Sequence, residues 1–407
     1  MSGPVLTFAT RDRHWAAARE MMRQRQLGCL LVGGFRARER YDTFLTDDYV
    51  EGSVVFPLEG EPVALTWTNM RVLRALDSAE RGHELWIQDY RVAPDGAAAA
   101  SVVREKTAGA RIGVVGLTSV APTEMHGAIP ASWWRQFTEA LPGASFEEVS
   151  VPYSDLMLLK TDEELALIRY AAQAAESACG VMREVVAPGA GEETVVAEVV
   201  REVLRHGMGL RYPEIVMNSG PHTLAWGPPR WTTRAEPPRR FERGDIVCAE
   251  IMPTYGNQEV QVQMSVALDP IDEVNQRCEG VAREAYEIGL REARPGVRFP
   301  DLVNAMAEPL RVAGCWAYTP LVHSVSPHFL LGRTRVNMPS DLGVRYVGPA
   351  GEVRPVRDVA LQPSMVLALE PNACLGTHRV NIGGTVIVTD AGCEELNSIP
   401  TRLTHKP

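Results

Sequence analysis

The sequence lacks the features that define several common classes of protein. Its seven cysteines are scattered over 407 residues without a C-x-x-C pair, which argues against a disulfide framework and indicates buried thiols in a reducing compartment. No run approaches the ~18 apolar residues that a membrane-spanning helix needs. The N-terminal stretch MSGPVLTFATRDRHW has no apolar core like that of a signal peptide. We therefore expect a cytoplasmic protein that does not engage a membrane.

An excess of basic residues is also missing. The chain has 41 Lys and Arg against 51 Asp and Glu, a formal net charge of −10, whereas a nucleic-acid-binding protein needs a basic face. With 45% hydrophobic and 23% charged residues, the composition is that of an ordinary globular protein. At roughly 150 residues per domain, the length favours two domains or more.

The first 150 residues alternate between strand-like and helical patterns. Strand-like runs fall at residues 29–32, 53–57, 62–67, 84–87 and 111–115. Helical spacing of apolar residues falls at 11–26, 70–79, 97–105 and 131–140. This alternation predicts an α/β domain.

A change of pattern marks a second domain. The segment 151–155 is expected to be a linker, and Thr161 then caps a long helix whose first turn carries three carboxylates. We therefore expect residues 1–155 to form an N-terminal α/β domain and residues 156–407 to form a C-terminal α+β domain. Within the latter, residues 246–252 and 259–268 flank a Tyr-Gly-Asn turn and predict a β-hairpin.

Five short motifs, in order and at the appropriate spacing, resemble the creatinase / aminopeptidase P / prolidase family of pita-bread enzymes. They are LKTDEELALIR at 159–169, NSG at 218–220, RGDIV at 243–247, MVLALEP at 365–371 and TVIVT at 385–389. The resemblance spans nearly the whole chain. It implies an α/β N-terminal domain followed by an α+β pita-bread catalytic domain.

The metallopeptidases of that family carry Asp, Asp, His, Glu and Glu around two metal ions. The corresponding positions here are Glu250, Gln261, His323, Glu370 and Gly383. Gln261 and Gly383 replace the two carboxylates that would bridge both metals. A neutral Gln is a poor ligand for a divalent ion, and Gly has no side chain. The resemblance therefore implies neither a dinuclear metal centre nor a cofactor, although one weakly held ion stays open.

Local features resemble the creatinase branch, which uses no metal. The run from His323 to Arg333 contains His-Ser, His-Phe and Gly-Arg pairs, similar to the creatinase pattern of His-Ser, His-Tyr and Gly-Arg. In creatinase, the His, the Arg and the Glu at the position of Glu370 contact the substrate. We therefore expect His323 and Glu370 to be catalytic and Arg333 to hold a substrate carboxylate, as a guanidinium can in a bidentate fork.

One departure from the family concerns its catalytic His between the Ser-Gly and Gly-Asp motifs. That position falls near Trp226 or Gly227, and His222 lies five residues too early. The usual general acid/base is either displaced to His222 or missing. Trp226 is expected to contact substrate from a loop that covers the site, with a surface anchor as the alternative.

Two further patterns favour a polar site. Strand alternation places Glu259, Gln261 and Gln263 on one face, and burying them unpaired would cost several kcal/mol. They line a cavity for substrate or form an exposed sheet face. Glu250 and Glu370 each follow an apolar run, so each must be paired or have a raised pKa. They are expected to bind substrate or move a proton, and a structural ion pair is the alternative.

Phe44 is the candidate site residue of the N-terminal domain. The segment 43–46 matches a loop that, in relatives, reaches the active site of the partner subunit. The resemblance therefore implies a homodimer in which Phe44 completes the partner's pocket. Ordinary packing is the alternative.

Together these features predict a metal-independent, creatinase-like hydrolase that cleaves an amidino- or amide-type C–N bond of a small polar substrate. Three alternatives remain open. They are a lyase or isomerase on the same fold, a metal-dependent Xaa-Pro peptidase, and a non-catalytic protein that binds a small molecule.

Overall fold

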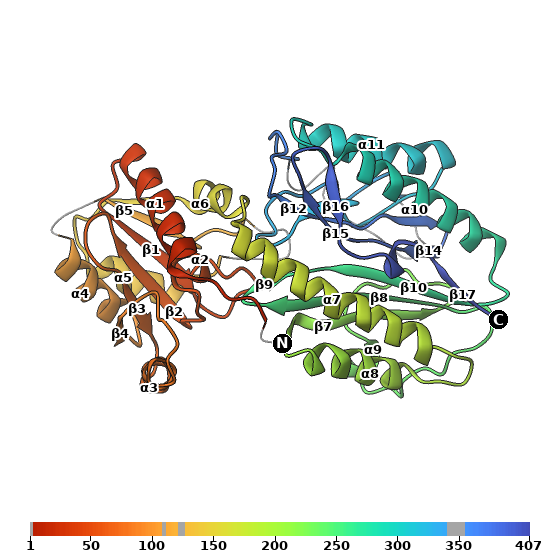
Figure 1. Cartoon of the computed structure of the whole chain (residues 1–407), viewed down its shortest axis with the longest axis horizontal. Coiled ribbons are helices and arrows are strands. Elements are labelled where there is room, and N and C mark those ends of the chain that lie inside the picture. The colour runs from red at the N-terminus through yellow and green to blue at the C-terminus, as the bar shows by residue number, and fades with distance from the viewer. Residues whose placement is uncertain (1–2, 108–110, 121–126, 340–354) are drawn as a thin grey trace. The chain divides into compact units, whose positions relative to one another are not determined.

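The structure, a computed structural model, describes residues 3–107, 111–120, 127–339 and 355–407 (Figure 1). The chain divides into two compact units. The N-terminal unit comprises Val5–Glu163 and the short segment Ser326–Phe329. The C-terminal unit comprises residues 164–325 and 330–407, with the residues before Val5. None of the described helices is long and apolar enough to span a membrane.

The expected linker at 151–155 is wrong. These residues lie in helix α6 (Ser150–Met157), and the side chain of Tyr153 is fully buried. Its hydroxyl donates a hydrogen bond to the carbonyl of Tyr41 at 3.0 Å. Packing within the N-terminal unit thus keeps this segment helical, although its Pro and Ser suggest a break.

The N-terminal unit is an α/β domain around one mixed sheet, as the alternating pattern predicted. The strand order is β4-β3-β2-β1-β5-β6. The strands are β1 (Cys29–Gly34), β2 (Gly52–Pro57), β3 (Val63–Thr66), β4 (Asp89–Val92), β5 (Ile112–Val115) and β6 (Phe146–Glu148). The helices are α1 (Phe8–Gln24), α2 (Thr43–Thr46), α3 (Asn69–Glu80), α4 (Gly96–Lys106), α5 (Ala131–Glu139) and α6. The strand expected at 84–87 is wrong, because the edge strand β4 begins at Asp89 and Trp86 and Ile87 are buried outside the sheet.

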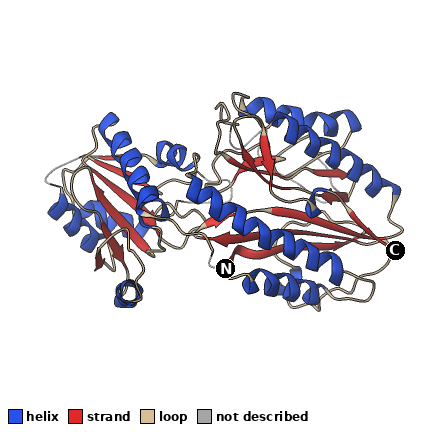
Figure 2. Ribbon diagram, in the orientation of Figure 1, coloured by secondary structure: helices blue, strands red, loops and turns tan. Residues whose placement is uncertain are grey.

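The described residues of the C-terminal unit form two larger sheets and a separate hairpin (Figure 2). The first sheet contains β7 (Gly209–Gly220), β8 (Ile246–Tyr255), β9 (Gln258–Glu259), β10 (Val262–Leu268) and β17 (Thr404–Lys406). The second contains β11 (Val322–Ser324), β12 (Val366–Leu369), β15 (Gly384–Val388) and β16 (Cys393–Glu395). The hairpin is β13 (Asn372–Leu375) with β14 (His378–Asn381).

Five helices of the described residues belong to this unit. They are α7 (Asp162–Val185), α8 (Glu192–Arg205), α9 (Arg230–Thr233), α10 (Glu273–Glu292) and α11 (Phe299–Ala313). The apolar faces of α7 and α8 share one hydrophobic core with the strands β7, β8 and β10. Helix α10 packs against α11 and against the β13–β14 hairpin. The candidate site is formed by residues of β8, β10, β11 and β14 and by residues next to β10 and β12.

The predicted β-hairpin is confirmed. Gly256 and Asn257 have φ of +53° and +59°, the left-handed conformation that a two-residue hairpin turn of this type requires. Pro253 has no N–H, and the strand opposite it is interrupted between β9 and β10. At this interruption, the backbone of Gln261 bonds to the side chain of Thr385. The Thr385 hydroxyl accepts from the N–H of Gln261 at 3.0 Å and donates to the carbonyl of Gln261 at 2.9 Å. The first sheet is thereby tied to β15 of the second.

Candidate active site

A cluster of buried polar side chains forms where the two sheets of the C-terminal unit meet. The sheets are joined by reciprocal backbone hydrogen bonds between Gln263 and Gly383, at 3.0 and 3.1 Å. The members of this polar cluster are Glu250, Gln261, Gln263, His323, Glu370, Arg379 and Asn381, each less than 5% exposed. Burial of so many polar groups costs free energy unless they are paired, so their pairing determines what the cluster can do.

The carboxylate of Glu370 accepts hydrogen bonds from Gln261, which lies just before β10, and from Gln263, which lies on it. The side-chain Nε2 of Gln261 donates to Oε2 of Glu370 at 3.3 Å, and that of Gln263 donates to the same oxygen at 3.0 Å. The predicted common face of Gln261 and Gln263 is thus confirmed. Their amide oxygens are buried and have no hydrogen-bond partner among the described residues. Both glutamines therefore keep an acceptor for a further donor.

His323 and Glu370 form an acid–base pair. Nδ1 of His323 lies 2.9 Å from the carbonyl oxygen of Ser324, and because a carbonyl only accepts, Nδ1 carries a proton. Nε2 lies 3.4 Å from Oε1 of Glu370. Burial is the largest single influence and would lower the pKa of His323, but the Glu370 carboxylate, the Ser324 carbonyl and the Glu259 charge together raise the pKa above its ordinary value. The pair can therefore hold a proton and pass it on.

Glu250 is held at the other side of the cluster. Its Oε2 accepts from the indole Nε1 of Trp226 at 2.9 Å, and its Oε1 accepts from Nδ2 of Asn381 at 3.3 Å. Burial and the nearby Glu370 carboxylate raise the pKa of Glu250 to about 7, although the Arg379 guanidinium opposes the shift. Near pH 7 this carboxyl group is therefore poised between its neutral and charged forms.

Arg379 and Asn381 are the members of the polar cluster that sequence reasoning missed. Arg379 is 2% exposed, and its Nη2 lies 3.9 Å from Oε1 of Glu250. A signal was available, because period-2 alternation in β14 places Arg379 on the same face as Asn381. The strand has only four residues, too few for that alternation to stand out.

Glu259 and Arg333 lie differently from the glutamines. Glu259 is buried, and its Oε2 pairs with Nε of Arg211 at 3.1 Å. Its charge helps to raise the pKa of His323. Arg333 follows Leu331, whose backbone bridges to His323. Its buried Nε has no hydrogen-bond partner among the described residues. Its role as a carboxylate ligand stays a prediction.

His222 and Phe44 have contacts outside the polar cluster. The exposed His222 places its Nδ1 2.8 Å from the hydroxyl of Thr377. Its ring packs edge-on against His378 at 4.7 Å, so these contacts are with the β13–β14 hairpin. Phe44 is 6% exposed and stacks on His14 at 3.9 Å, so packing within its own unit accounts for it. Its role across a dimer stays a prediction.

The residues at the family's metal positions do not fit a dinuclear centre. Gly383 has a φ of +148°, and a Cβ there would lie 2.0 Å from the carbonyl oxygen of Leu369, so the backbone leaves no space for a carboxylate side chain. Gln261 presents its amide nitrogen to Glu370. In the part of the chain that the structure describes, no three or more His, Cys, Asp or Glu side chains are placed to hold a metal ion.

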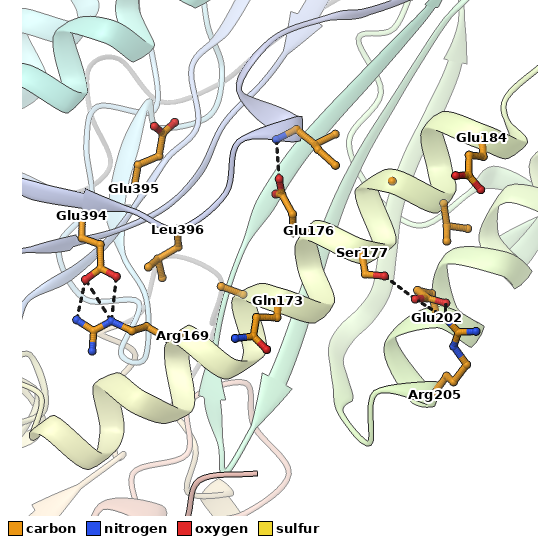
Figure 3. A pocket seen from close by; sticks show the side chains of 14 residues that line it. Arg169, Gln173, Glu176, Ser177, Glu184, Glu202, Arg205, Glu394, Glu395 and Leu396 are labelled. Atoms are coloured by element: carbon orange, nitrogen blue, oxygen red, sulfur yellow. Dashed lines mark hydrogen bonds and ion pairs between the residues drawn. The ribbon is translucent and has the colours of Figure 1, made fainter. Parts of the chain in front are cut away.

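A separate cavity of about 830 Å³ lies between α7, α8 and β16 (Figure 3). Its polar side chains are largely paired with each other or with nearby backbone. Arg169 pairs with Glu394 at 2.6 Å, and Ser177 donates to Glu202 at 2.5 Å. Glu176 accepts from the backbone N–H of Ile399 at 3.0 Å. These pairings suit a structural role, so the polar cluster is the stronger candidate site.

The chain is similar to known enzymes over most of its length. Residues 166–390, more than half of the chain, match the model of metallopeptidase family M24. Ectoine hydrolase of Halomonas elongata is 24% identical, over 88% of this chain and 87% of its own. Creatinase of a Bacillus species is 25% identical, over 67% of this chain and 64% of its own.

Solved structures extend the similarity to the fold of the whole chain. X-Pro aminopeptidase from Thermotoga maritima superposes with a TM-score of 0.71 at 16% identity, covering 96% of this chain and 99% of that one. The expected architecture, an α/β N-terminal domain followed by a pita-bread domain, is therefore confirmed. The five motifs, the superposition and the family model agree, and the chain belongs to metallopeptidase family M24, a family of hydrolases.

Proposed function

We propose that this chain is a metal-independent hydrolase that cleaves a C–N bond in a small substrate with a cationic amidine or guanidine group. The observation that carries the proposal is the set of amide oxygens of Gln261, Gln263 and Asn381. They are buried beside two carboxylates and have no hydrogen-bond partner among the described residues. Each unsatisfied buried acceptor costs about 1–3 kcal/mol. A ligand rich in N–H donors and positive charge would satisfy them.

The names of two relatives point to the same chemistry. Ectoine is a cyclic amidine with a carboxylate, and creatine is a guanidine with a carboxylate. In both, one carbon is bonded to two or more nitrogens, and hydrolysis breaks one of these C–N bonds. Glu250 and Glu370 would bind the cationic group of such a substrate, and Arg333 would bind its carboxylate.

His323 is the proposed acid and base of the reaction. Neutral Nε2 would take a proton from the attacking water as its oxygen bonds to the amidine-type carbon. The same nitrogen would then return the proton to the departing nitrogen as the C–N bond breaks. Glu370 would hold the imidazole ring and stabilise its charged form. His222 is assigned no step, because its contacts are with the β13–β14 hairpin.

A substrate panel tests the proposal. The purified full chain is incubated with ectoine, creatine, a simple amide and an Xaa-Pro dipeptide, each with EDTA and with Mn²⁺, and products are identified by mass spectrometry. We expect turnover of an amidine or guanidine substrate that EDTA does not reduce. Turnover that EDTA abolishes and Mn²⁺ restores would overturn the metal-independent reaction. Calorimetric binding without turnover would instead indicate a non-catalytic protein.

A further inference from the structure

A buried arginine connects the polar cluster to the loop that carries Trp226. Nη1 of Arg379 donates to the carbonyl oxygens of Thr223 and Ala225, at 3.3 and 3.2 Å. In return, the hydroxyl of Thr223 donates to the carbonyl of Arg379 at 2.8 Å. Three hydrogen bonds therefore fix this loop to strand β14.

Tyr318 supplies a further anchor for the same loop. Its hydroxyl donates to the carbonyl oxygen of Leu224 at 2.5 Å, so three consecutive carbonyls of the loop, at 223, 224 and 225, each accept a side-chain hydrogen bond. The guanidinium of Arg379 lies 5.3 Å from the centre of the Tyr318 ring. The two anchors thus pack together beneath the loop.

Trp226 follows the anchored carbonyls directly. Its indole N–H is bonded to Glu250, yet the residue is 46% exposed. One edge of the ring thus belongs to the polar cluster, while much of the remainder is accessible. An aromatic face beside two carboxylates suits a cationic ligand, because the ring adds a cation–π attraction to the charge pairing.

The hydrogen-bond geometry distinguishes two roles for Arg379. As a counter-ion for Glu250, it would direct its donors at that carboxylate, but the separation of 3.9 Å is longer than a hydrogen bond. The loop carbonyls, at 3.2 and 3.3 Å, are within hydrogen-bond distance. Burying a guanidinium is costly; here Nη1 donates both of its hydrogen bonds to the loop, while the buried Nε has no hydrogen-bond partner among the described residues.

We infer that Arg379 is a positioning residue that holds Trp226 at the polar cluster and thereby sets the affinity for a cationic substrate. The nature of the ligand rests on the proposed function, whereas the control of Trp226 by Arg379 does not. Loss of Arg379 should therefore displace Trp226 in the free protein. It should also weaken substrate binding more than it slows the chemical step.

The first test needs no substrate. The chain has eight tryptophans, so the fluorescence of Trp226 is obtained as the difference between each protein and its Trp226→Phe counterpart. In Arg379→Met we expect this difference spectrum to shift to the red and its acrylamide quenching constant to rise at least about twofold, with Arg379→Lys in between. Circular dichroism verifies the fold. An unchanged difference spectrum in folded Arg379→Met would overturn the inference.

Milder variants keep the test decisive if Arg379→Met does not fold. Tyr318→Phe removes only the bond to the Leu224 carbonyl, and Thr223→Ala removes only the bond to the Arg379 carbonyl. Each should shift the Trp226 difference spectrum in the same direction by a smaller amount. Spectra identical to that of the unmodified chain in both variants would overturn the inference.

The second test uses the substrate found with the panel above. We expect Arg379→Met to raise KM about tenfold and to change kcat less than about threefold. The double variant with Trp226→Phe should bind no more weakly than the worse single variant. A loss confined to kcat would contradict a positioning role. If the panel yields no substrate, the fluorescence result still stands, so failure of the proposed function and failure of this inference are distinguishable.

Discussion

The two units of this chain each bury charged side chains, but the units differ in how far hydrogen bonds satisfy the buried polar groups. In the N-terminal unit, Asp42 is fully buried and both of its carboxylate oxygens are bonded. Oδ1 accepts from Nε of Arg40 at 3.2 Å, and Oδ2 accepts from Nη2 of Arg40 at 2.7 Å and from the N–H of Val50 at 3.0 Å. In the C-terminal unit, the polar cluster surrounds two carboxylates with amide groups whose oxygens have no hydrogen-bond partner among the described residues.

This difference separates a structural ion pair from a candidate site. A satisfied buried pair holds its segment in one arrangement, and removing either partner leaves an unpaired charge. A partly satisfied cluster lowers the stability of the folded state, and such costs are typical of sites that a ligand completes. The predictions below test whether the two buried groups differ in this way.

The largest expected effect is on the stability of the N-terminal unit. Asp42→Ala leaves Arg40 buried without its carboxylate, and we expect a loss of about 3–5 kcal/mol in the free energy of unfolding. Denaturant titration measures it. Asp12→Ala is the control, because Asp12 is 65% exposed in its pair with Arg11, and its loss should stay below about 1 kcal/mol. If the two variants lost similar amounts of unfolding free energy, the Asp42–Arg40 pair would not be a structural ion pair of the kind described.

In the polar cluster, we expect loss of activity without loss of stability. Glu370→Gln removes the charge that holds the His323 proton, so turnover of the substrate should fall about 100–1,000-fold, while the unfolding midpoint stays level or rises. Glu394→Gln is the matched control, because Glu394 forms only a half-exposed pair with Arg169. If Glu370→Gln were as active as Glu394→Gln, the assignment of Glu370 to the active site would be wrong.

The ionisation of Glu250 should make the free energy of unfolding depend on pH, because the polar cluster does not fully compensate its buried charge. Its pKa is raised from 4.5 to about 7 by burial and the Glu370 charge. Its contribution to stability is therefore fully present below pH 4.5 and lost as the pH rises through 7. We expect Glu250→Gln to match the unmodified chain near pH 4.5 and to be about 3 kcal/mol more stable at pH 8, because one unit of pKa shift corresponds to about 1.4 kcal/mol. Denaturant titrations at both pH values measure this, and a difference that does not grow with pH would contradict it.

The smallest expected effect is that of metal ions. A ligand present at 100 times its Kd stabilises a protein by about 2.7 kcal/mol, which would raise the melting temperature by several degrees. Because the polar cluster does not fit a dinuclear centre, EDTA or Mn²⁺ should move the melting temperature by less than about 1 °C. A rise of several degrees with Mn²⁺, reversed by EDTA, would show that the cluster is completed by a metal.

Local patterns were sufficient for much of the fold and part of the site. The Gly256-Asn257 turn predicts its hairpin because few other residues adopt two consecutive left-handed conformations. Alternation along the following strand brings Gln261 and Gln263 to the same carboxylate. The helix at 151–155 was missed because it depends on the burial of Tyr153 in the N-terminal unit.

By itself, the sequence determined the α/β pattern of the first 150 residues and the hairpin around Gly256-Asn257, and through its family resemblance it indicated the loss of carboxylates at Gln261 and Gly383. These properties follow from local periodicity, turn chemistry and the identity of single residues. Only the tertiary structure decided how the buried charges are shared. Arg379 meets the Trp226 loop, and Glu370 meets His323, through contacts between segments far apart in the chain. Because desolvation and Coulomb interactions depend on distance in space, the pKa values and the open acceptors of the polar cluster exist only once the two sheets have packed together.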